Sequence, residues 1–241
     1  MELVLLTLVA VLAGAVASVA GFGIGSLLTP ALAPELGVRL AVVAVAIPHA
    51  AGTALRFWRL RRSIDRGVLR AFGVASAIGG LAGALLHGVA SSPALAVVFG
   101  LLLIMSGLAG LTGWIERIHL RGRMAIVAGA LSGLFGGIVG NQGGIRTAAL
   151  LAFPLRRDAF IATATATALI VDAARLPVYL ANVGPELAPH AGLIALLTPG
   201  VVVGTLIGER VLRRIPEPVF KRTVSILLLA LGAWMLFDTI R

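Results

Sequence analysis

Apolar residues along this chain occur in long uninterrupted stretches, which short polar or basic segments separate. Many of these stretches run for roughly 17–22 residues, the length that an α-helix needs to cross the hydrocarbon core of a bilayer. Six full crossings are predicted, at 39–57, 70–88, 94–114, 158–181, 190–208 and 220–240. The pattern therefore predicts an all-α polytopic membrane protein with a single membrane domain over residues 1–241.

Two glycine-rich stretches of similar layout recur along the chain, GFGIGSLLTPAL at 21–32 and GNQGGIRTAALL at 140–151. Each follows an apolar helix and leads through a short apolar segment into an Ala-rich helix, a helix with spaced glycines and a Leu-rich helix. This order predicts a duplication, with repeat one at 1–117 and repeat two at 118–241. The spaced glycines are predicted to be helix-packing surfaces; they are Gly79, Gly83, Gly129, Gly133, Gly137, Gly200, Gly204 and Gly208.

The connecting segments of the two repeats differ in charge. Segment 56–70 holds six arginines, whereas its counterpart 182–190 has no Lys or Arg; segment 87–93 has none, and its counterpart 210–222 has five. Because short loops rich in Lys and Arg stay in the cytoplasm, this asymmetry predicts that the repeats lie in opposite orientations. An odd number of crossings per repeat achieves this. The predicted fold is two inverted repeats, each a broken or re-entrant helical hairpin followed by three transmembrane helices.

Composition narrows the class of function. The 241 residues are 59% hydrophobic and 12% charged, with a mean hydropathy of +1.04, which a soluble domain would not show. The absence of cysteine excludes thiolate catalysis, disulfides and Cys-based metal sites. The net charge of +10 lies mainly in the short loops, without the aromatic-interleaved basic face of a nucleic-acid binder. No HExxH, GxSxG, P-loop or paired-acid motif occurs, so we expect no enzyme, cofactor or metal site.

Polar and glycine residues of the two glycine-rich stretches are the first candidates for binding. Short helices are expected to begin near Ser26 and Ile145, with N-termini at the membrane centre, where free N–H groups favour an anion. Arg146 adds a guanidinium suited to oxyanions. The predicted binding residues of these stretches are Gly21, Gly23, Gly25, Ser26, Asn141, Gln142, Gly143, Gly144 and Arg146. The alternative is that the glycines only allow close helix packing.

Three polar residues inside the predicted crossings extend this candidate site. His49, Thr163 and Thr167 are predicted to contact the substrate. His49 could instead hydrogen-bond backbone that Pro48 leaves unpaired, and the threonines could bond back to their own helix. His87, near the end of a crossing, is interpreted as interfacial.

Asp172 and Arg175 lie one helical turn apart in crossing 158–181. An ionisable residue inside a membrane segment is a functional hypothesis by default, so this pair is predicted to serve proton coupling. The alternative is an intrahelical structural pair in which Arg175 reaches the outer interface. The arginines of segment 56–70 are interpreted as a topology signal.

These parts together resemble the TauE/SafE family of bacterial membrane proteins, the sulfite exporters. The resemblance covers nearly the whole chain and rests on both glycine-rich stretches, on the Ala-rich helix after each and on the basic segment RFWRLRRSIDRG at 56–67. It implies transport of small sulfur-containing anions, such as sulfite or organosulfonates, across the bacterial cytoplasmic membrane. In the family both stretches are richer in glycine; here Ile24 interrupts the first, and Asn141 and Gln142 occupy the second.

The sequence therefore predicts a secondary transporter of a small anion, which would bind between the stretches 21–26 and 140–145. Coupling to an ion gradient or to the membrane potential is expected because no ATP-binding motif is present. The expected partners are the anion and membrane lipid, and a homodimer is compatible with this interpretation. A passive anion channel and a non-transporting membrane scaffold are the alternatives.

Overall fold

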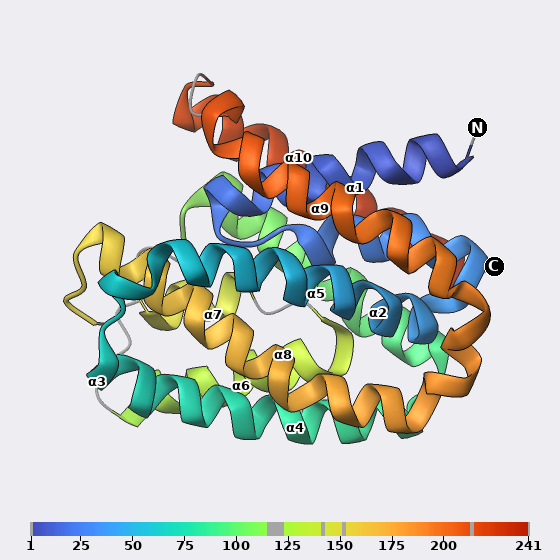
Figure 1. Cartoon of the computed structure of the whole chain (residues 1–241), viewed down its shortest axis with the longest axis horizontal. Coiled ribbons are helices and arrows are strands. Elements are labelled where there is room, and N and C mark those ends of the chain that lie inside the picture. Colours follow the sequence, from blue (N-terminus) through green and yellow to red (C-terminus); the bar gives the residue numbers. More distant parts are fainter. Residues whose placement is uncertain (1, 115–122, 141–142, 151–152, 213–214, 241) are drawn as a thin grey trace.

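The computed structural model describes residues 2–114, 123–140, 143–150, 153–212 and 215–240, and every regular element in these ranges is helical (Figure 1). The α-helices are α1 (Glu2–Ala20), α2 (Ile24–Leu60), α3 (Arg66–Val68), α4 (Val74–Val89), α5 (Ser92–Thr112), α6 (Arg123–Val139), α7 (Gly143–Leu150), α8 (Arg157–Leu187), α9 (Ala191–Leu212) and α10 (Glu217–Ile240). Short 3₁₀ or π segments connect some of them: η1 (Arg61–Ser63), η2 (Leu69–Gly73) and η4 (Ala188–His190). The predicted all-α class is confirmed for the described residues.

Six helical stretches of the described residues are long and apolar enough to cross a membrane. They are Leu3–Ala20, Ile24–Ser63, Arg66–Val89, Ser92–Thr112, Asp158–Gly208 and Pro218–Thr239. These stretches cover the six crossings expected from the sequence, and no expected crossing extends more than two residues beyond them. Two of the expected crossings, 158–181 and 190–208, fall within the fifth stretch, which α8 and α9 form together. They add α1, which the sequence had assigned to a hairpin. The protein is a polytopic membrane protein.

Both glycine-rich stretches break a helix. α1 ends at Ala20, and the chain turns through residues 21–23, the first turn, where Gly21 has φ 78° and Gly23 has φ 136°. α6 ends at Val139, and Gly140, which marks the second turn, has φ 75°. A side chain would be strained at such φ values, so glycine is required there. The next helices begin at Ile24 and Gly143, two residues earlier than the sequence suggested.

α2 is broken a second time, at Gly37. The φ of 70° and ψ of 155° at this residue divide α2 into a short arm, residues 24–36, and a long arm, residues 38–60. The order along the first part of the chain is therefore α1, the first turn, the short arm and the long arm. In the second part it is α6, the second turn, α7 and α8. The two parts have the same sequence of elements.

Glycines hold two helix pairs in close contact at corresponding positions. α9 packs along α1 and α4 packs along α6. A Cβ atom at Gly79 of α4 would overlap the Ala130 carbonyl oxygen of α6, and one at Gly204 of α9 would overlap the Val11 carbonyl oxygen of α1. Gly204 follows Gly79 by 125 positions (204 − 79), and Ala130 follows Val11 by 119 (130 − 11). The predicted role of the spaced glycines in helix packing is confirmed.

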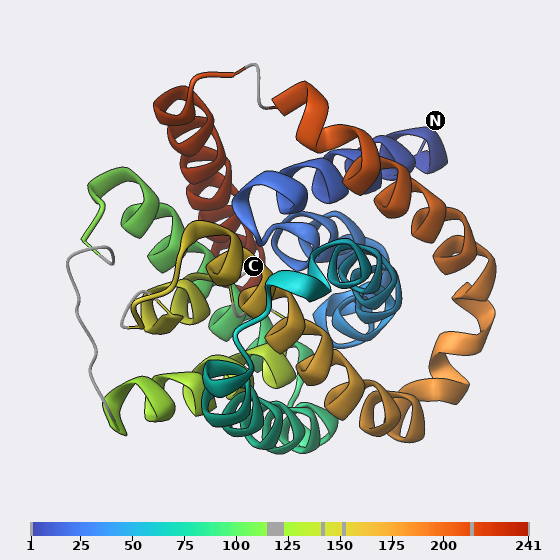
Figure 2. The ribbon, with the colours of Figure 1, turned by 60° about the vertical axis from the view of Figure 1, so that its left-hand side comes forward.

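α5 and α10 pack against each other in the same reciprocal way. A Cβ at Gly107 would lie 2.7 Å from the Ser225 carbonyl oxygen, and one at Gly232 would lie 2.7 Å from the Gly100 carbonyl oxygen. The members of both pairs correspond at a spacing of 125 positions (232 − 107 and 225 − 100). Figure 2 shows the centre of the bundle, where α8 and α9 curve around the long arm of α2.

The arginine-rich connection that leads into α3 and the connection of α8 to α9 lie at opposite ends of the bundle. In Figure 1 the chain that carries the exposed Arg61 and Arg62 and leads into α3 is at the left-hand end. The loop 153–156, which contains Arg156, lies at the same end. The connection of α8 to α9 through η4, which has no Lys or Arg, lies at the right-hand end.

Candidate functional site

The two turns meet inside the protein. A Cβ atom at Gly25, in the short arm, would lie 2.7 Å from the Gly140 carbonyl oxygen, and the Phe22 side chain packs against Gly143 of α7. The Arg146 side chain, on α7, donates a hydrogen bond of 3.0 Å from Nη2 to the Gly21 carbonyl oxygen. The structure therefore brings together the stretches that the sequence selected as candidates, although they lie about 120 positions apart.

An arginine caps the C-terminal end of α1, and another caps the C-terminal end of α6. The last carbonyl groups of a helix have no partner within it. Arg56 Nη1 donates to the Ala17 carbonyl oxygen of α1 at 2.8 Å, and Arg175 Nη1 donates to the Gly136 carbonyl oxygen of α6 at 2.6 Å. The same oxygens accept the N–H groups of the glycines that open the turns, at 3.0 Å each. Each arginine thereby fixes the position of one turn.

Two further side chains cap α6. The Tyr179 hydroxyl donates to the Gly137 carbonyl oxygen, and Nδ1 of His87 lies 2.7 Å from the Ile138 carbonyl oxygen. Nε2 of His87 lies 3.1 Å from the Arg39 carbonyl oxygen. His87 lies in the last turn of α4, near the segment end as expected, but its side chain is only 1% exposed and is buried between helices. The ring fills a gap between α4, α6 and the start of the long arm, where both nitrogens face backbone carbonyl oxygens and a neutral imidazole donates to one of them.

Asp172 is the centre of a buried ionic cluster. One carboxylate oxygen, Oδ1, accepts from Arg175 Nη2 at 2.8 Å and from Nε at 3.0 Å. The other, Oδ2, lies 2.7 Å from Nδ1 of His49. Arg175 is 1% exposed, so it does not reach the outer interface as the structural alternative required. The two residues do form an i,i+3 pair, as that alternative proposed, and His49 extends the pair to α2.

The threonines of α8 are divided among three environments. Thr163 accepts a hydrogen bond of 3.0 Å from the Asp65 backbone N–H, beside the basic connection, and not from the turns. Thr165, which the sequence left out, accepts from Arg56 Nη2 at 3.0 Å. Thr167 Oγ1 is buried and has no partner among the described residues. Of the three, only Thr165 has a hydrogen bond to a buried arginine.

The other candidates are placed as follows. Gly23 and Ser26 flank the start of the short arm, where Ser26 is 3% exposed, and Gly144 is the second residue of α7. Asn141 and Gln142 lie outside the described residues.

Arg56 is the main residue that sequence reasoning missed. It is 8% exposed and buried in the long arm, whereas the sequence counted it with the basic loop. A signal was available: Arg56 precedes Arg175 by 119 positions, the spacing that also separates Gly21 from Gly140 (140 − 21). Tyr179 and His87 had no comparable signal, because their role depends on carbonyl groups of another helix.

Buried positive charge exceeds buried negative charge in the described residues. Three arginines are less than 9% exposed: Arg56, Arg146 and Arg175. Asp172 is the single carboxylate among the described side chains that is buried to the same degree. It forms its ion pair with Arg175, and neither Arg56 nor Arg146 forms an ion pair with a described carboxylate. A buried cation without a counter-ion is costly, and an anion would offset that cost.

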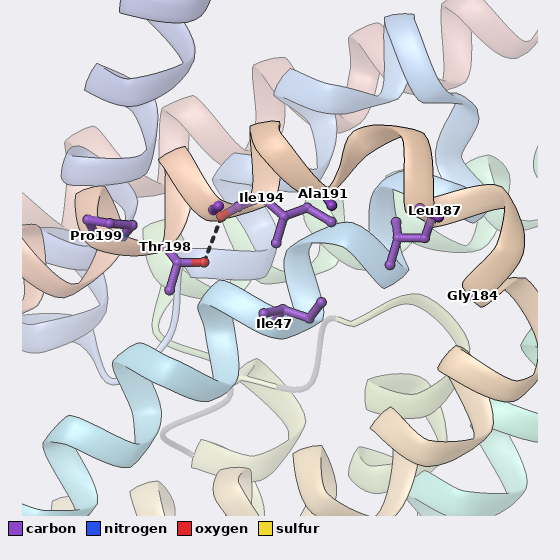
Figure 3. A pocket seen from close by; sticks show the side chains of 9 residues that line it. Ile47, Gly184, Leu187, Ala191, Ile194, Thr198 and Pro199 are labelled. Atoms are coloured by element: carbon purple, nitrogen blue, oxygen red, sulfur yellow. Dashed lines mark hydrogen bonds between the residues drawn. The ribbon is translucent and has the colours of Figure 1, made fainter.

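A separate cavity of about 540 Å³ lies between the long arm and the connection of α8 to α9 (Figure 3). Its lining is aliphatic or small apart from one hydroxyl and consists of Ile47, Gly184, Leu187, Ala188, Ala191, Ile194, Ala195, Thr198 and Pro199. The Thr198 hydroxyl donates to the Ile194 carbonyl oxygen of its own helix at 2.7 Å. This cavity offers no charged group to an anion.

Comparison with known proteins gives one family. The family model described as Sulfite exporter TauE/SafE matches residues 6–235, nearly the whole chain. No curated protein and no solved structure matches the chain.

Proposed function

The chain belongs to the sulfite exporter TauE/SafE family of membrane transporters, and from its buried cations we propose that it is a secondary transporter of a small anion. The substrate is a sulfur-containing oxyanion or an organosulfonate, and the protein resides in the bacterial cytoplasmic membrane. The anion binds at the level where the two turns meet.

The guanidinium of Arg146 is the observation that carries this proposal. Arg146 is 3% exposed, and its single hydrogen bond among the described residues goes to the Gly21 carbonyl oxygen. Its Nε and Nη1 atoms are buried and have no described partner. These two nitrogens lie on different edges of the guanidinium, and each has an N–H that can donate to an oxygen of a sulfur oxyanion. An anion beside either edge accepts a charge-assisted hydrogen bond and neutralises the charge.

The backbone near the turns supports the same position. The first helical hydrogen bond of the short arm runs from the Leu27 N–H to the Gly23 carbonyl oxygen. The backbone amides of residues 24–26 therefore come before the first hydrogen bond between successive turns of this helix. Amides at a helix start favour an anion, and α7 starts opposite them at Gly143.

An inverted repeat explains how such a site reaches both sides of the membrane. Its support is the spacing of 119 or 125 positions between equivalent contacts, together with the presence of Lys and Arg in only one of each two equivalent loops. In this arrangement α1 of the first half packs along α9 of the second half, and α6 of the second half packs along α4 of the first half. Movement of one half against the other then exposes the turns alternately to each side.

Proton coupling is assigned to Asp172 and His49. A buried carboxylate and imidazole 2.7 Å apart can share or exchange one proton. A passive channel, the second candidate function, would show anion flux that is independent of any proton gradient.

The test is anion flux in proteoliposomes loaded with sulfite or a small sulfonate. Wild-type protein should move the anion, and Arg146→Ala should reduce the flux at least tenfold, since removing a charge-assisted contact costs about 1.5–3 kcal/mol. Arg62→Ala, at an exposed arginine of η1, is the matched control and should keep wild-type flux. Absence of flux and binding in the wild type, or full activity of Arg146→Ala, would contradict the proposal. A tolerated Arg146→Leu would favour the scaffold alternative.

A further inference from the structure

Arg56 and Arg175 occupy equivalent positions in the two halves. They are 119 positions apart (175 − 56), and so are the carbonyl groups that they cap, Ala17 and Gly136 (136 − 17). Both side chains lie in the interior and hold the end of a broken helix. A purely structural capping role therefore predicts the same electrostatic surroundings for both arginines.

The surroundings differ in one residue. Arg175 is neutralised by Asp172. The residue 119 positions before Asp172 is Thr53 (172 − 119), which is buried but uncharged. Arg56 instead donates to the neutral hydroxyl of Thr165. The half that contains Arg56 thus keeps a buried positive charge without an ion-pair partner, whereas in the other half Asp172 neutralises the equivalent charge on Arg175.

Arg56 also converges with Arg146 on one atom. Arg146 Nη2 donates to the Gly21 carbonyl oxygen at 3.0 Å, and Arg56 Nη2 lies 3.5 Å from the same oxygen. Two guanidinium groups of like charge therefore share a single neutral acceptor inside the bundle. Such an arrangement is repulsive unless a negative charge joins it, and neither arginine pairs with a described carboxylate.

We propose that Arg56 and Arg146 form a two-arginine clamp beside the first turn, and that this clamp selects small doubly charged oxyanions over singly charged ones. The inference rests on the proposed function, whose site it completes with a residue from the other half. Two uncompensated cations match a dianion in charge. A monoanion would leave one buried positive charge unbalanced, and that residual charge is the basis of the discrimination.

The clamp also joins the halves through the substrate. Arg56 comes from the long arm of α2, and Arg146 comes from α7, which follows the second turn. In the absence of an anion, the Gly21 carbonyl oxygen is the only described acceptor common to both side chains. A bound dianion supplies acceptors to both guanidiniums and draws the first turn and α7 together. Occupancy of the site is therefore linked to the relative position of the two halves.

Sulfate and methanesulfonate provide a matched pair of probes, because both are tetrahedral at sulfur and differ by one negative charge. The measurement is thermal unfolding of the detergent-solubilised protein against each anion, in a buffer whose other anion is gluconate. In the wild type, sulfate should produce half-maximal stabilisation at a concentration at least about tenfold lower than methanesulfonate, the scale of one charge-assisted hydrogen bond.

Arg56→Gln keeps a donor for the helix end but removes the charge, and it should abolish most of this difference. Arg56→Lys should retain part of it, and Arg62→Gln, on the exposed η1 segment, should leave it unchanged. Equal half-maximal concentrations for the two anions in the wild type would overturn the clamp while leaving the proposed function intact. So would an unchanged difference in Arg56→Gln. No stabilisation by either anion, with no flux, would overturn both proposals. If Arg56→Gln does not fold, the wild-type comparison still decides.

Discussion

Nδ1 of His49 lies 2.7 Å from Oδ2 of Asp172, and this contact joins the long arm of α2 to α8 inside the membrane bundle. The same carboxylate binds Arg175, which in turn holds the last turn of α6. Three helices therefore depend on one buried acid. A change of charge at Asp172 reaches the second turn through a single intervening side chain.

Asp172→Asn should destabilise the protein by about 3 kcal/mol or more, because it leaves the Arg175 guanidinium buried without its counter-ion. Thermal unfolding in detergent measures the change. Asp158→Asn, at an exposed acid in the first turn of the same helix, should have little effect. The double variant Asp172→Asn with Arg175→Gln should recover part of the loss. A double variant less stable than Asp172→Asn alone would contradict the pairing as its cause.

His49→Asn should uncouple anion flux from the proton gradient. The amide keeps a hydrogen-bonding group near Asp172 but does not titrate, so the pair loses one proton acceptor. In proteoliposomes, an imposed pH gradient should accelerate anion flux by the wild type and leave flux by His49→Asn unchanged. An equal response of both proteins would remove His49 from the coupling step.

Gly204→Ala and Gly79→Ala should each destabilise the protein by about 1–3 kcal/mol, because the added methyl overlaps a backbone carbonyl of the facing helix. The two losses should be similar, since the proposed repeats place the two contacts at corresponding positions. Gly192→Ala is the matched control, because a Cβ there has no heavy atom within 4 Å. Thermal unfolding of the three variants distinguishes these cases. Destabilisation by Gly192→Ala as large as by the others would argue against overlap as the cause.

Single cysteines can report the orientation of the halves, since the natural chain has none. A cysteine at Ser63 or Pro216 should react with a membrane-impermeant thiol reagent only from the cytoplasmic side, because basic residues surround both positions. A cysteine at Ser91 or Ala188 should react only from the outside. Ser63 and Ala188 belong to connections that the proposed repeats make equivalent. Labelling of both from the same side would exclude the inverted arrangement.

The membrane class, the helical spans and the positions of both helix breaks could be predicted from the sequence because they depend on local properties. A run of apolar residues fixes a crossing wherever it occurs, and a glycine-rich stretch marks a turn without knowledge of its neighbours. The spaced glycines could also be assigned to packing in advance, since close helix contact requires small residues on whichever helices meet. Arg146 could be selected for a related reason, because it follows a glycine-rich turn in an apolar chain.

The partners of the buried polar side chains could not be predicted in this way, because they come from distant segments. Arg56 looked like part of a basic loop, and only the fold places its guanidinium against α1 and beside Arg146. Thr163 and Thr165 are two residues apart, yet the first bonds the Asp65 amide and the second bonds Arg56.

The sequence alone thus determined where the chain crosses the membrane and where it turns, because hydrophobicity and backbone freedom act residue by residue. The tertiary structure alone decided which buried charges are compensated. The reason is physical: the energy of a buried charge depends on the atoms within a few ångströms of it, and in this protein those atoms belong to residues as many as 125 positions away.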